Sequence, residues 1–322
     1  MSEDVISTGV IGVGHLGQHH ARLYSDFRDV DLVGVVDVDE DRGREIADRH
    51  DTTYYNDIEN LIPKIQAASV VVPTEDHFKI GRKLIQNQID CLIEKPMVET
   101  LNQAEELYNL ARKDNVLLQV GHVERFNTAF VTAREYIDNP RYIEVQRLGP
   151  FTNRSDDIGV VMDLMIHDID ILLSLVDSPV KNISAVGASV ITDFEDITNA
   201  RFEFENGCVA NLTASRVSPD PRREIRVFQD HDFVTLNLNY KDQKVKMWQS
   251  NNGEVKSVDD FEIFSPPVQN GESLRRELLH FVHCIKEDRQ PVVGGGEGRD
   301  AIKVAFDVMS SVKHSNQLNG IE

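Results

Sequence analysis

The chain has 322 residues, which is sufficient for two domains, and its 40% hydrophobic and 27% charged residues are typical of a globular protein. Its formal net charge of −20 excludes nucleic acid and anionic membranes as general partners, because a surface this acidic repels them. No run of about 18 apolar residues is present, so a membrane-spanning helix is not expected.

The first 122 residues alternate between short apolar runs and helical patterns, as in parallel strands buried on both faces and joined by helices. The expected strands are Val10–Val13, Leu32–Val36, Ser69–Val72, Ile89–Ile93 and Val116–Val120. The expected helices are His15–Phe27, Glu40–Arg49, His77–Gln86 and Leu101–Lys113, the last capped by Thr100. These repeated units predict an α/β domain over residues 1–122 with a doubly wound parallel sheet of the Rossmann type.

In residues 123–322 the pattern of apolar residues changes from alternating strands and helices to a series of strands with few helices. This pattern predicts an α+β domain with an open, mostly antiparallel sheet. Two helices are expected at Phe130–Ile137 and Val161–Val176, and closing helices at Ser273–Ile285 and Arg299–Val312. Period-2 stretches at Ile183–Ile191, Ala200–Glu205, Val209–Ala214, Glu224–Phe228, Phe233–Leu238 and Val245–Trp248 are expected to be strands. Asn206-Gly207 is a hairpin-turn signal, and Gly294-Gly295-Gly296 is expected to be a loop.

A glycine-rich turn, Gly12-Val13-Gly14-His15-Leu16-Gly17, follows the first strand and opens the first helix. Gly12 is predicted to permit a tight turn, Gly14 the approach of a pyrophosphate, and Gly17 close helix–sheet packing. Because the helix N-terminus also offers N–H groups to phosphates, Gly12, Gly14, His15, Leu16 and Gly17 are expected to contact a dinucleotide. The pattern is weak alone and gains weight from its place between a strand and a helix.

Asp37 ends the second strand, about 20 residues beyond Gly17, where a carboxylate can accept both ribose hydroxyls. The same carboxylate would repel a 2′-phosphate, so NAD is predicted in preference to NADP. Arg42 and Arg44 are the local counter-signal, and an acidic turn without a ligand is the alternative.

Glu94-Lys95-Pro96 directly follows the strand Ile89–Ile93, and open parallel sheets bind ligands beyond the carboxyl ends of their strands. Pro96 biases Lys95 towards an extended backbone. The Lys95 ammonium is therefore predicted to hold a substrate hydroxyl and to stabilise negative charge that develops on its oxygen. A solvated loop lysine is the alternative.

The segment Val161–Val176 is apolar almost all round, which predicts a buried helix. Asp163, His167, Asp170 and Ser174 recur at spacings of four, three and four, so they are expected on one narrow stripe of that helix. Because burying such a stripe without partners is costly, it is predicted to line a polar cavity, with His167 as general base and Asp163 orienting it. The alternatives are a structural His–Asp network and a metal site, and no metal is predicted.

Cys91, Cys208 and Cys284 are far apart and lack the spacing of a metal site, so they are expected to be reduced structural thiols. The acidic start, Met1-Ser2-Glu3-Asp4, lacks the basic residues and long apolar run of a secretory signal. The protein is therefore expected in the cytoplasm.

Together these motifs resemble the glucose–fructose oxidoreductase / inositol dehydrogenase / MocA (Gfo/Idh/MocA) family over nearly the whole chain. Glu94-Lys95-Pro96 followed by Asp163-x-x-x-His167 is the most specific part. Val71-Val72-Pro73-Thr74 with His77, and Val120-Gly121-His122 with Arg125-Phe126, extend the similarity. The resemblance implies Lys95 and His167 as the catalytic pair with Asp163 assisting, and Thr74, His77, Glu94 and Lys95 along the NAD groove.

Glu144–Phe151 and Leu164–Asp170 are similar to the bacterial UDP-amino-sugar 3-dehydrogenases. This similarity implies NAD-dependent oxidation of a ring hydroxyl, for example of UDP-N-acetylglucosamine to its 3-keto form. A sugar diphosphate requires local positive charge, for which Arg125, Arg147, Arg154, Arg216, Arg222 and Arg223 are candidates. The predicted substrate contacts are Lys95, Arg125, Arg154, Asp163 and His167.

Three alternatives stay open: a myo-inositol or free-sugar dehydrogenase, an NAD-dependent glycoside hydrolase of the same fold family, and a non-catalytic dinucleotide sensor. Lys95 and His167 argue against the sensor, because a sensor needs neither. The open sheet needs its exposed face covered, so a homodimer or homotetramer is expected. The expected ligand is a small-molecule sugar or nucleotide sugar, and neither nucleic acid nor membrane is an expected partner.

Overall fold

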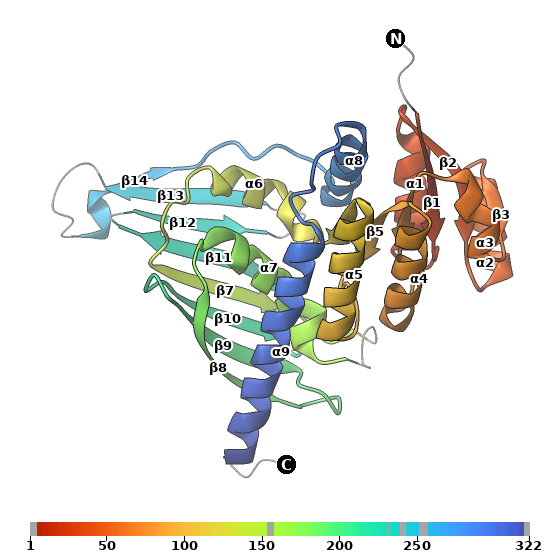
Figure 1. The fold of residues 1–322 in the computed structure, drawn as a ribbon. Coiled ribbons are helices and arrows are strands. Elements are labelled where there is room, and N and C mark those ends of the chain that lie inside the picture. Colours follow the sequence, from red (N-terminus) through yellow and green to blue (C-terminus); the bar gives the residue numbers. More distant parts are fainter. Residues whose placement is uncertain (1–4, 153–157, 231, 239–242, 251–256, 319–322) are drawn as a thin grey trace. The chain divides into compact units, whose positions relative to one another are not determined.

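The computed structural model describes residues 5–152, 158–230, 232–238, 243–250 and 257–318. The chain divides into two compact units (Figure 1). The first consists of Met1–Val123 and Glu272–Ile302, and the second of Glu124–Gly271 and Lys303–Glu322. Within the described residues, none of the helices combines the length and apolar character needed to cross a membrane.

The first unit is built on a six-stranded parallel sheet of order β3-β2-β1-β4-β5-β6. Its strands are β1 (Ile6–Ile11), β2 (Val30–Val36), β3 (Thr53–Tyr55), β4 (Ala67–Val70), β5 (Asp90–Glu94) and β6 (Leu118–Gly121). All four residues of β4 are buried, which explains why the central strands read as unbroken apolar runs. The order reverses between β1 and β4, at the kind of switch point where doubly wound sheets bind nucleotides. The predicted Rossmann-type sheet is confirmed.

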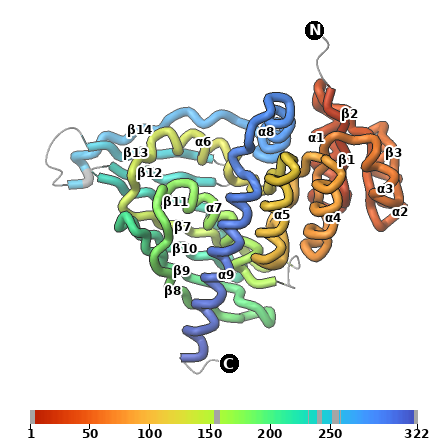
Figure 2. The backbone as a smooth tube through the Cα atoms, in the orientation of Figure 1, coloured from red at the N-terminus to blue at the C-terminus, as the bar shows by residue number. Residues whose placement is uncertain are grey.

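Helices cover both faces of this sheet. They are α1 (Gly17–Asp26), α2 (Glu40–Arg49), α3 (Ile58–Leu61) with a 3-10 turn at Ile62–Lys64, α4 (Thr74–Gln86), α5 (Leu101–Asp114), α8 (Ser273–Lys286) and the start of α9 (Gly295–Leu318). On one face, α1, α2 and α8 share a core that includes Leu92, whereas the next residue, Ile93, packs towards the adjacent helices α4 and α5 (Figure 1, Figure 2). As predicted, Thr100 caps α5, within a reciprocal capping box with Gln103.

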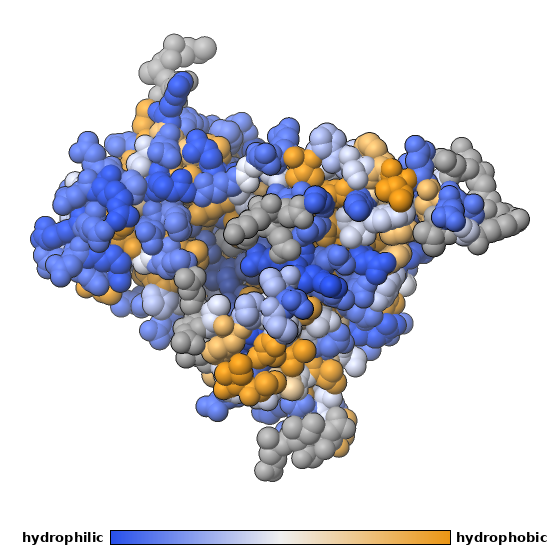
Figure 3. All heavy atoms as spheres, turned by 180° about the vertical axis from the view of Figure 1, so that it is seen from behind, coloured by the Kyte–Doolittle hydropathy of each residue, from blue (hydrophilic) through white to orange (hydrophobic). Residues whose placement is uncertain are grey.

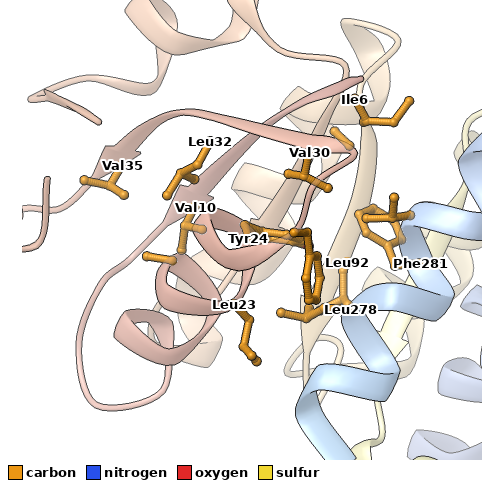
Figure 4. Packing of buried hydrophobic residues seen from close by; sticks show 14 of the residues in the cluster. Ile6, Val10, Leu23, Tyr24, Val30, Leu32, Val35, Leu92, Leu278 and Phe281 are labelled. Carbon is orange, nitrogen blue, oxygen red and sulfur yellow. The ribbon is translucent and has the colours of Figure 1, made fainter. Parts of the chain in front are cut away.

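Helix α8 completes the core of the first unit although it lies about 150 residues beyond β6 in the sequence. Leu278 and Phe281 of α8 are fully buried and belong to the same cluster as Tyr24 of α1 (Figure 4). The Tyr24 hydroxyl lies 2.8 Å from Ser69 Oγ of β4. By its position in the sequence this helix was predicted in the second domain, but a sequence does not show which apolar face a helix will cover.

The second unit contains an eight-stranded sheet of order β14-β13-β12-β11-β7-β10-β9-β8. Its strands are β7 (Tyr142–Leu148), β8 (Val180–Ala188), β9 (Ile197–Phe204), β10 (Val209–Ser215), β11 (Arg222–Gln229), β12 (Asp232–Asn237), β13 (Lys244–Ser250) and β14 (Phe261–Phe264). Only the β7–β10 pairing among these is parallel, which confirms the mostly antiparallel sheet. Gly207, at a φ of +86°, turns the chain from β9 into β10 as predicted.

One face of the second sheet carries the helices of this unit. These are α6 (Thr128–Arg134), a π-helical turn (Val161–Met165), α7 (Ile166–Leu175) and the later half of α9, with 3-10 turns at Val123–Phe126 and Val258–Asp260. In β7, Ile143, Val145 and Arg147 point to the covered face and are buried, whereas Tyr142 and Glu144 alternate with them and are half-buried. The backbone N–H of Ala185 in β8 donates to Ser311 Oγ of α9.

The uncovered face of this sheet is partly exposed and carries a row of aromatic rings. Ring centroids lie 5.7 Å apart for Tyr142 and Phe228, 5.4 Å for Phe228 and Phe233, and 4.4 Å for Phe233 and Trp248. Elsewhere on this unit, Val186, Val190, Ile191 and Phe194 are large exposed apolar residues of β8 and the β8–β9 connection. Figure 3 shows a mainly hydrophilic surface on which apolar residues gather in one area low in that view.

Several elements differ from the sequence expectations. Strands β3, β7 and β14 were not predicted. In β7, Ile143 and Val145 alternate with polar residues as in a strand, but the charged Arg147 occupies the next inward position. The first strand ends at Ile11 instead of Val13, since the turn already begins at Gly12. Gly295 and Gly296 lie in the first turn of α9 and not in a loop. The expected single helix over residues 161–176 is a π-turn followed by α7.

Candidate active site

The glycine-rich turn of the first unit fits the backbone of a dinucleotide. Gly12 has a φ of +84°, and a Cβ there would lie 2.4 Å from the carbonyl oxygen of Val71. A Cβ on Gly17 would lie 1.9 Å from the Gly12 carbonyl oxygen, so only glycine lets α1 start this close to the turn. A Cβ on Gly14, by contrast, meets nothing within 4 Å. The open space at Gly14, before the N-terminus of α1, is where a pyrophosphate can approach the backbone.

His15 and Leu16 are both exposed at the start of α1, the positions at which the sequence predicted cofactor contacts. Leu16 is the N-cap residue and its side chain makes no capping hydrogen bond. Both side chains therefore flank the helix end that offers its N–H groups to phosphate.

Asp37, directly after β2, has a buried carboxylate with four hydrogen-bond donors. Backbone N–H groups of Val13 and Asp39 donate to it at 2.8 and 2.9 Å, and Arg42 donates through Nη2 at 2.6 Å and Nε at 3.2 Å. Burial raises the pKa of Asp37, but these hydrogen bonds, led by Arg42, bring the net pKa below its usual value. The carboxylate is therefore ionised and fits the predicted ribose contact, with Arg42 as a competing donor. Arg44 instead pairs with Glu40.

Thr74 and His77 lie in the first turns of α4, but their side chains have different environments. Thr74, the first residue of α4, is partly exposed. His77 is buried, with Nδ1 2.9 Å from the Pro96 carbonyl oxygen and Nε2 2.9 Å from that of Val72. The His77 side chain therefore contacts the segments that follow β4 and β5.

Glu94 and Lys95 follow each other at the carboxyl end of β5, and a third residue that the sequence analysis missed joins them. Glu94 is 9% exposed, and its Oε1 lies 3.3 Å from Nε2 of His20, a fully buried side chain of α1. Lys95 is partly exposed, and its backbone N–H donates to Glu94 Oε2 at 3.2 Å. The signal for His20 was available: it lies three residues after Gly17, on the helix face that packs on the sheet.

His167 and Asp163 of the second unit lie at the junction between the π-turn and α7. Both are partly exposed on a segment that is otherwise largely buried. Single π-turns inside helices are frequent at functional sites. Of the other two residues of the predicted stripe, Asp170 is buried, and Ser174 Oγ donates to the Ile171 carbonyl within α7. No cluster of three metal-ligating side chains occurs in the part of the chain that the structure describes.

A buried charge cluster holds α7 against the sheet next to His167. Arg147 of β7 donates to both oxygens of Asp168, at 2.9 and 2.7 Å, and to Glu124 Oε1 at 2.9 Å. Arg223 of β11, opposite Arg147 in the register, lies 3.3 Å from the same Glu124 oxygen. Burial raises the pKa of Asp168 despite the attraction of Arg147. The sequence analysis missed the role of Asp168, because the carboxylate next to a candidate base gives no sign of its partner across the sheet.

Asp170 lies one turn beyond His167 and pairs with Arg125, whose Nη1 is 3.2 Å from Asp170 Oδ1. Burial raises the pKa of Asp170 to about 7, and Arg125 offsets this only in part. Two charged pairs therefore fix the first turns of α7, one through Asp168 and one through Asp170.

The arginines considered for a diphosphate have different surroundings in the structure. Arg147 and Arg216 are buried and bound to carboxylates, Arg216 through Nε at 2.7 Å from Asp196 Oδ1. Arg222 lies in β11 next to Arg223 and so points to the opposite, uncovered face, where it donates to Gln146. Arg223 is about one-third exposed on the α7 side, and Arg125 less so. Arg154 lies outside the described residues.

Comparisons with known proteins agree with these two units. Residues 6–122 match the family model of the oxidoreductase family with an NAD-binding Rossmann fold, and residues 119–235 match the GFO/IDH/MocA C-terminal domain. The chain is 33% identical over 307 residues to the UDP-N-acetylglucosamine 3-dehydrogenase of Acidithiobacillus ferrooxidans, covering 95% of this chain and 97% of that protein. It is 25% identical over 337 residues to the scyllo-inositol 2-dehydrogenase (NAD(+)) of Bacillus subtilis, covering 97% and 95% of the two chains.

Solved structures give the same assignment. A structure of the Acidithiobacillus ferrooxidans UDP-N-acetylglucosamine 3-dehydrogenase superposes with a TM-score of 0.90 at 32% identity, covering 96% of this chain and 98% of that one. A levoglucosan dehydrogenase in complex with NADH and levoglucosan shares the fold at a TM-score of 0.86 and 16% identity, covering 96% and 97%. With its NAD-binding Rossmann unit and its second unit both matched, the chain belongs to the GFO/IDH/MocA family of oxidoreductases.

Proposed function

We propose that this protein is an NAD-dependent dehydrogenase that oxidises a ring hydroxyl of a nucleotide sugar, with UDP-N-acetylglucosamine and its 3-keto product as the substrate pair. The observation that carries this proposal is the 33% identity across 95% of the chain to an enzyme of that name. The fit of the glycine-rich turn and Asp37 to a dinucleotide supports the cofactor.

We assign the proton chemistry to Lys95 and His167, with Asp163 assisting. His167 accepts the hydroxyl proton, because an imidazole titrates near neutral pH, and the Lys95 ammonium holds the oxygen as it becomes a carbonyl. Bound NAD would supply the acceptor for the carbinol hydride. Gly12, Gly14, Gly17, Asp37 and the start of α1 would hold it. The charge cluster at Asp168 keeps the helix that carries His167 fixed relative to the second sheet.

Arg223 is our candidate for the sugar diphosphate, with Arg125 as the second. Arg223 is partly exposed on the α7 side of the sheet, and it shares its partner Glu124 with Arg147. Arg222 provides a matched control, because it is the neighbouring arginine on the other face. We expect Arg223→Gln to raise KM for the UDP-sugar about tenfold or more, the value of one charge-assisted contact, and Arg222→Gln to leave it within twofold. Equal effects of the two substitutions would contradict this assignment.

The direct test of activity is NADH absorbance after adding NAD and a panel of sugars. UDP-N-acetylglucosamine, its uronic acid form, glucose, myo-inositol and scyllo-inositol would each be assayed, with a ketone trap to draw the equilibrium forward. We expect signal with the UDP-sugars only. Signal with an inositol would favour the second candidate, which the similarity to scyllo-inositol 2-dehydrogenase supports. Cleavage of a glycoside without accumulation of NADH would indicate the hydrolase.

Lys95→Ala tests the catalytic assignment. We expect kcat to fall at least about 100-fold, the usual contribution of a positioned proton-handling group. Lys79→Ala, at an exposed lysine of α4, serves as the control. Near-normal turnover in Lys95→Ala would overturn the assigned role.

We further propose a homodimer or homotetramer in the cytoplasm. The half-exposed aromatic row from Tyr142 to Trp248 supports burial of the uncovered sheet face between copies of the chain. Cys91, Cys208 and Cys284 are all buried free thiols, which supports a reducing compartment. Sedimentation of the protein and of a Trp248→Glu variant would test the interface, since a charge inside it should favour the monomer.

A further inference from the structure

Lys95 is the middle residue of a short segment whose two neighbours are each held by a buried histidine. Glu94 precedes it and contacts His20 of α1, and Pro96 follows it and contacts His77 of α4. All of these residues belong to the first unit. A flexible lysine side chain is thus attached to a backbone that is fixed on both sides.

The first anchor is the Glu94 carboxylate, both of whose oxygens have a partner. Oε1 lies 3.3 Å from His20 Nε2, and Oε2 accepts the backbone N–H of Lys95 at 3.2 Å. Burial raises the pKa of Glu94, but the close contact with His20 and its charge, together with the nearby Lys95 ammonium, outweigh it and lower the net pKa. An ionised carboxylate therefore links α1 to the backbone of Lys95.

Gly121 of β6 leaves the room that this carboxylate occupies. Glu94 and Gly121 are paired in the β5–β6 register, and a Cβ on Gly121 would lie 2.9 Å from the Glu94 carboxyl carbon. Any larger residue there would push the carboxylate from its place. The side chain of Glu94 is therefore confined between β6 and His20.

The second anchor is His77, which is 1% exposed and lies between two backbone carbonyls. Its Nδ1 is 2.9 Å from the Pro96 oxygen, and its Nε2 is 2.9 Å from the Val72 oxygen. Burial lowers the pKa of His77 and outweighs the two carbonyl contacts, which raise it. The neutral ring carries one N–H and donates to one of these two carbonyls, and it packs between the segments that follow β4 and β5, on the sheet edge where Lys95 emerges.

We propose that His20 and His77 are positioning residues for Lys95, His20 acting through the Glu94 carboxylate and His77 through the Pro96 carbonyl. This inference rests on the proposed catalytic role of Lys95. Neither histidine touches substrate in this scheme. Their effect is to hold the Lys95 backbone in one place, and a displacement of about 1 Å at a catalytic group can cost about 100-fold in rate.

The test uses His20→Leu and His20→Gln in the full-length enzyme. Leucine removes the contact with Glu94, whereas glutamine can still donate a hydrogen bond to it. We expect kcat to fall about 10- to 100-fold in His20→Leu and to recover at least about fivefold of that loss in His20→Gln. The Kd for NAD, measured by calorimetry, should stay within about threefold, because the glycine-rich turn and Asp37 are untouched.

Amide hydrogen exchange gives a readout that does not depend on catalysis. In the protein without cofactor, peptides that contain Lys95 should exchange at least about tenfold faster in His20→Leu and in His77→Leu than in the parent. His50→Leu is the control, because His50 is a partly exposed histidine that contacts Ser25 at the end of α1. Unchanged exchange at Lys95 in both variants would overturn the proposal.

The double variant His20→Leu/Glu94→Gln separates positioning from general stabilisation. In His20→Leu the buried Glu94 carboxylate loses its partner, and the change of Glu94 to glutamine removes that unpaired charge. A purely structural role predicts that Tm and kcat recover together. Positioning predicts that Tm recovers while kcat stays at least about tenfold low. If exchange at Lys95 rises as expected but Lys95→Ala keeps full turnover, His20 and His77 do hold the Lys95 backbone, and the proposed catalytic role of Lys95 is wrong.

Discussion

Arg147 is predicted to be the residue of the second unit whose loss costs most stability. It is 4% exposed and neutralises two carboxylates that are each 2% exposed, Asp168 and Glu124. Replacing it with methionine keeps the apolar part of the side chain and leaves both carboxylates buried, with Arg223 as a partly exposed partner for Glu124. Removing one partner of a buried ion pair costs about 3–5 kcal/mol, which corresponds to a fall in Tm of roughly 6–20 °C for a unit of this size.

The assay is thermal unfolding of Arg147→Met followed by circular dichroism, with the triple variant Arg147→Met/Glu124→Gln/Asp168→Asn as its partner. Because the triple variant buries no uncompensated charge, it should regain at least half of the lost Tm. Lowering the pH from 8 to 5.5 should reduce the loss of Tm in Arg147→Met, since burial raises the pKa of Asp168 and its carboxylate can then take up a proton. A Tm within about 2 °C of the parent, or a triple variant as unstable as the single one, would refute this reasoning.

Gly17→Ala places a Cβ 1.9 Å from the Gly12 carbonyl oxygen, so calorimetry should show NAD binding at least about tenfold weaker and unfolding should show a loss of about 1–3 kcal/mol. Arg42→Ala removes the cation that pairs with Asp37, so the preference for NAD over NADP should widen about tenfold; an unchanged ratio of the two Kd values would count against it. For Asp170, burial raises the folded-state pKa from 3.8 to about 7, so its stabilising contribution is complete below about pH 4 and is lost as the pH rises through 7. Asp170→Asn should therefore flatten the pH dependence of unfolding by roughly 4 kcal/mol between pH 4 and 8, and an unaltered slope would exclude Asp170 as its source.

The fold could be predicted wherever local pattern and final environment agree. Helix α2 begins and ends at the predicted residues, Glu40 and Arg49, since its apolar positions and its N-cap, Asp39, lie within the segment itself. Strand β7 could not be predicted, because the polar side chain of Arg147 is stabilised by carboxylates from Glu124 and α7 that no local window contains.

The residues of the candidate site likewise fall into those whose geometry follows from local sequence and those whose partners lie far away in the sequence. The glycine-rich turn and Asp37 belong to one continuous strand–helix–strand unit, β1–α1–β2, so their spacing alone predicts their geometry. The family resemblance implied His77 along the cofactor groove, and in the structure the ring of His77 lies against the Pro96 carbonyl. His20 was missed although its spacing from Gly17 places it on the face of α1 that packs on the sheet. Asp168 was missed because its partner, Arg147, comes from another element, which the local sequence does not show.

The late position of α8 has a consequence for how the protein is made. Phe281 is synthesised more than 250 residues after Tyr24, yet both belong to one buried cluster. During translation, the face of the first sheet that α8 covers therefore stays exposed until most of the second unit has emerged from the ribosome. The core of the first unit can be completed only after most of the second unit has been made, so we expect slow, non-local completion of that core and a need for protection from aggregation until then.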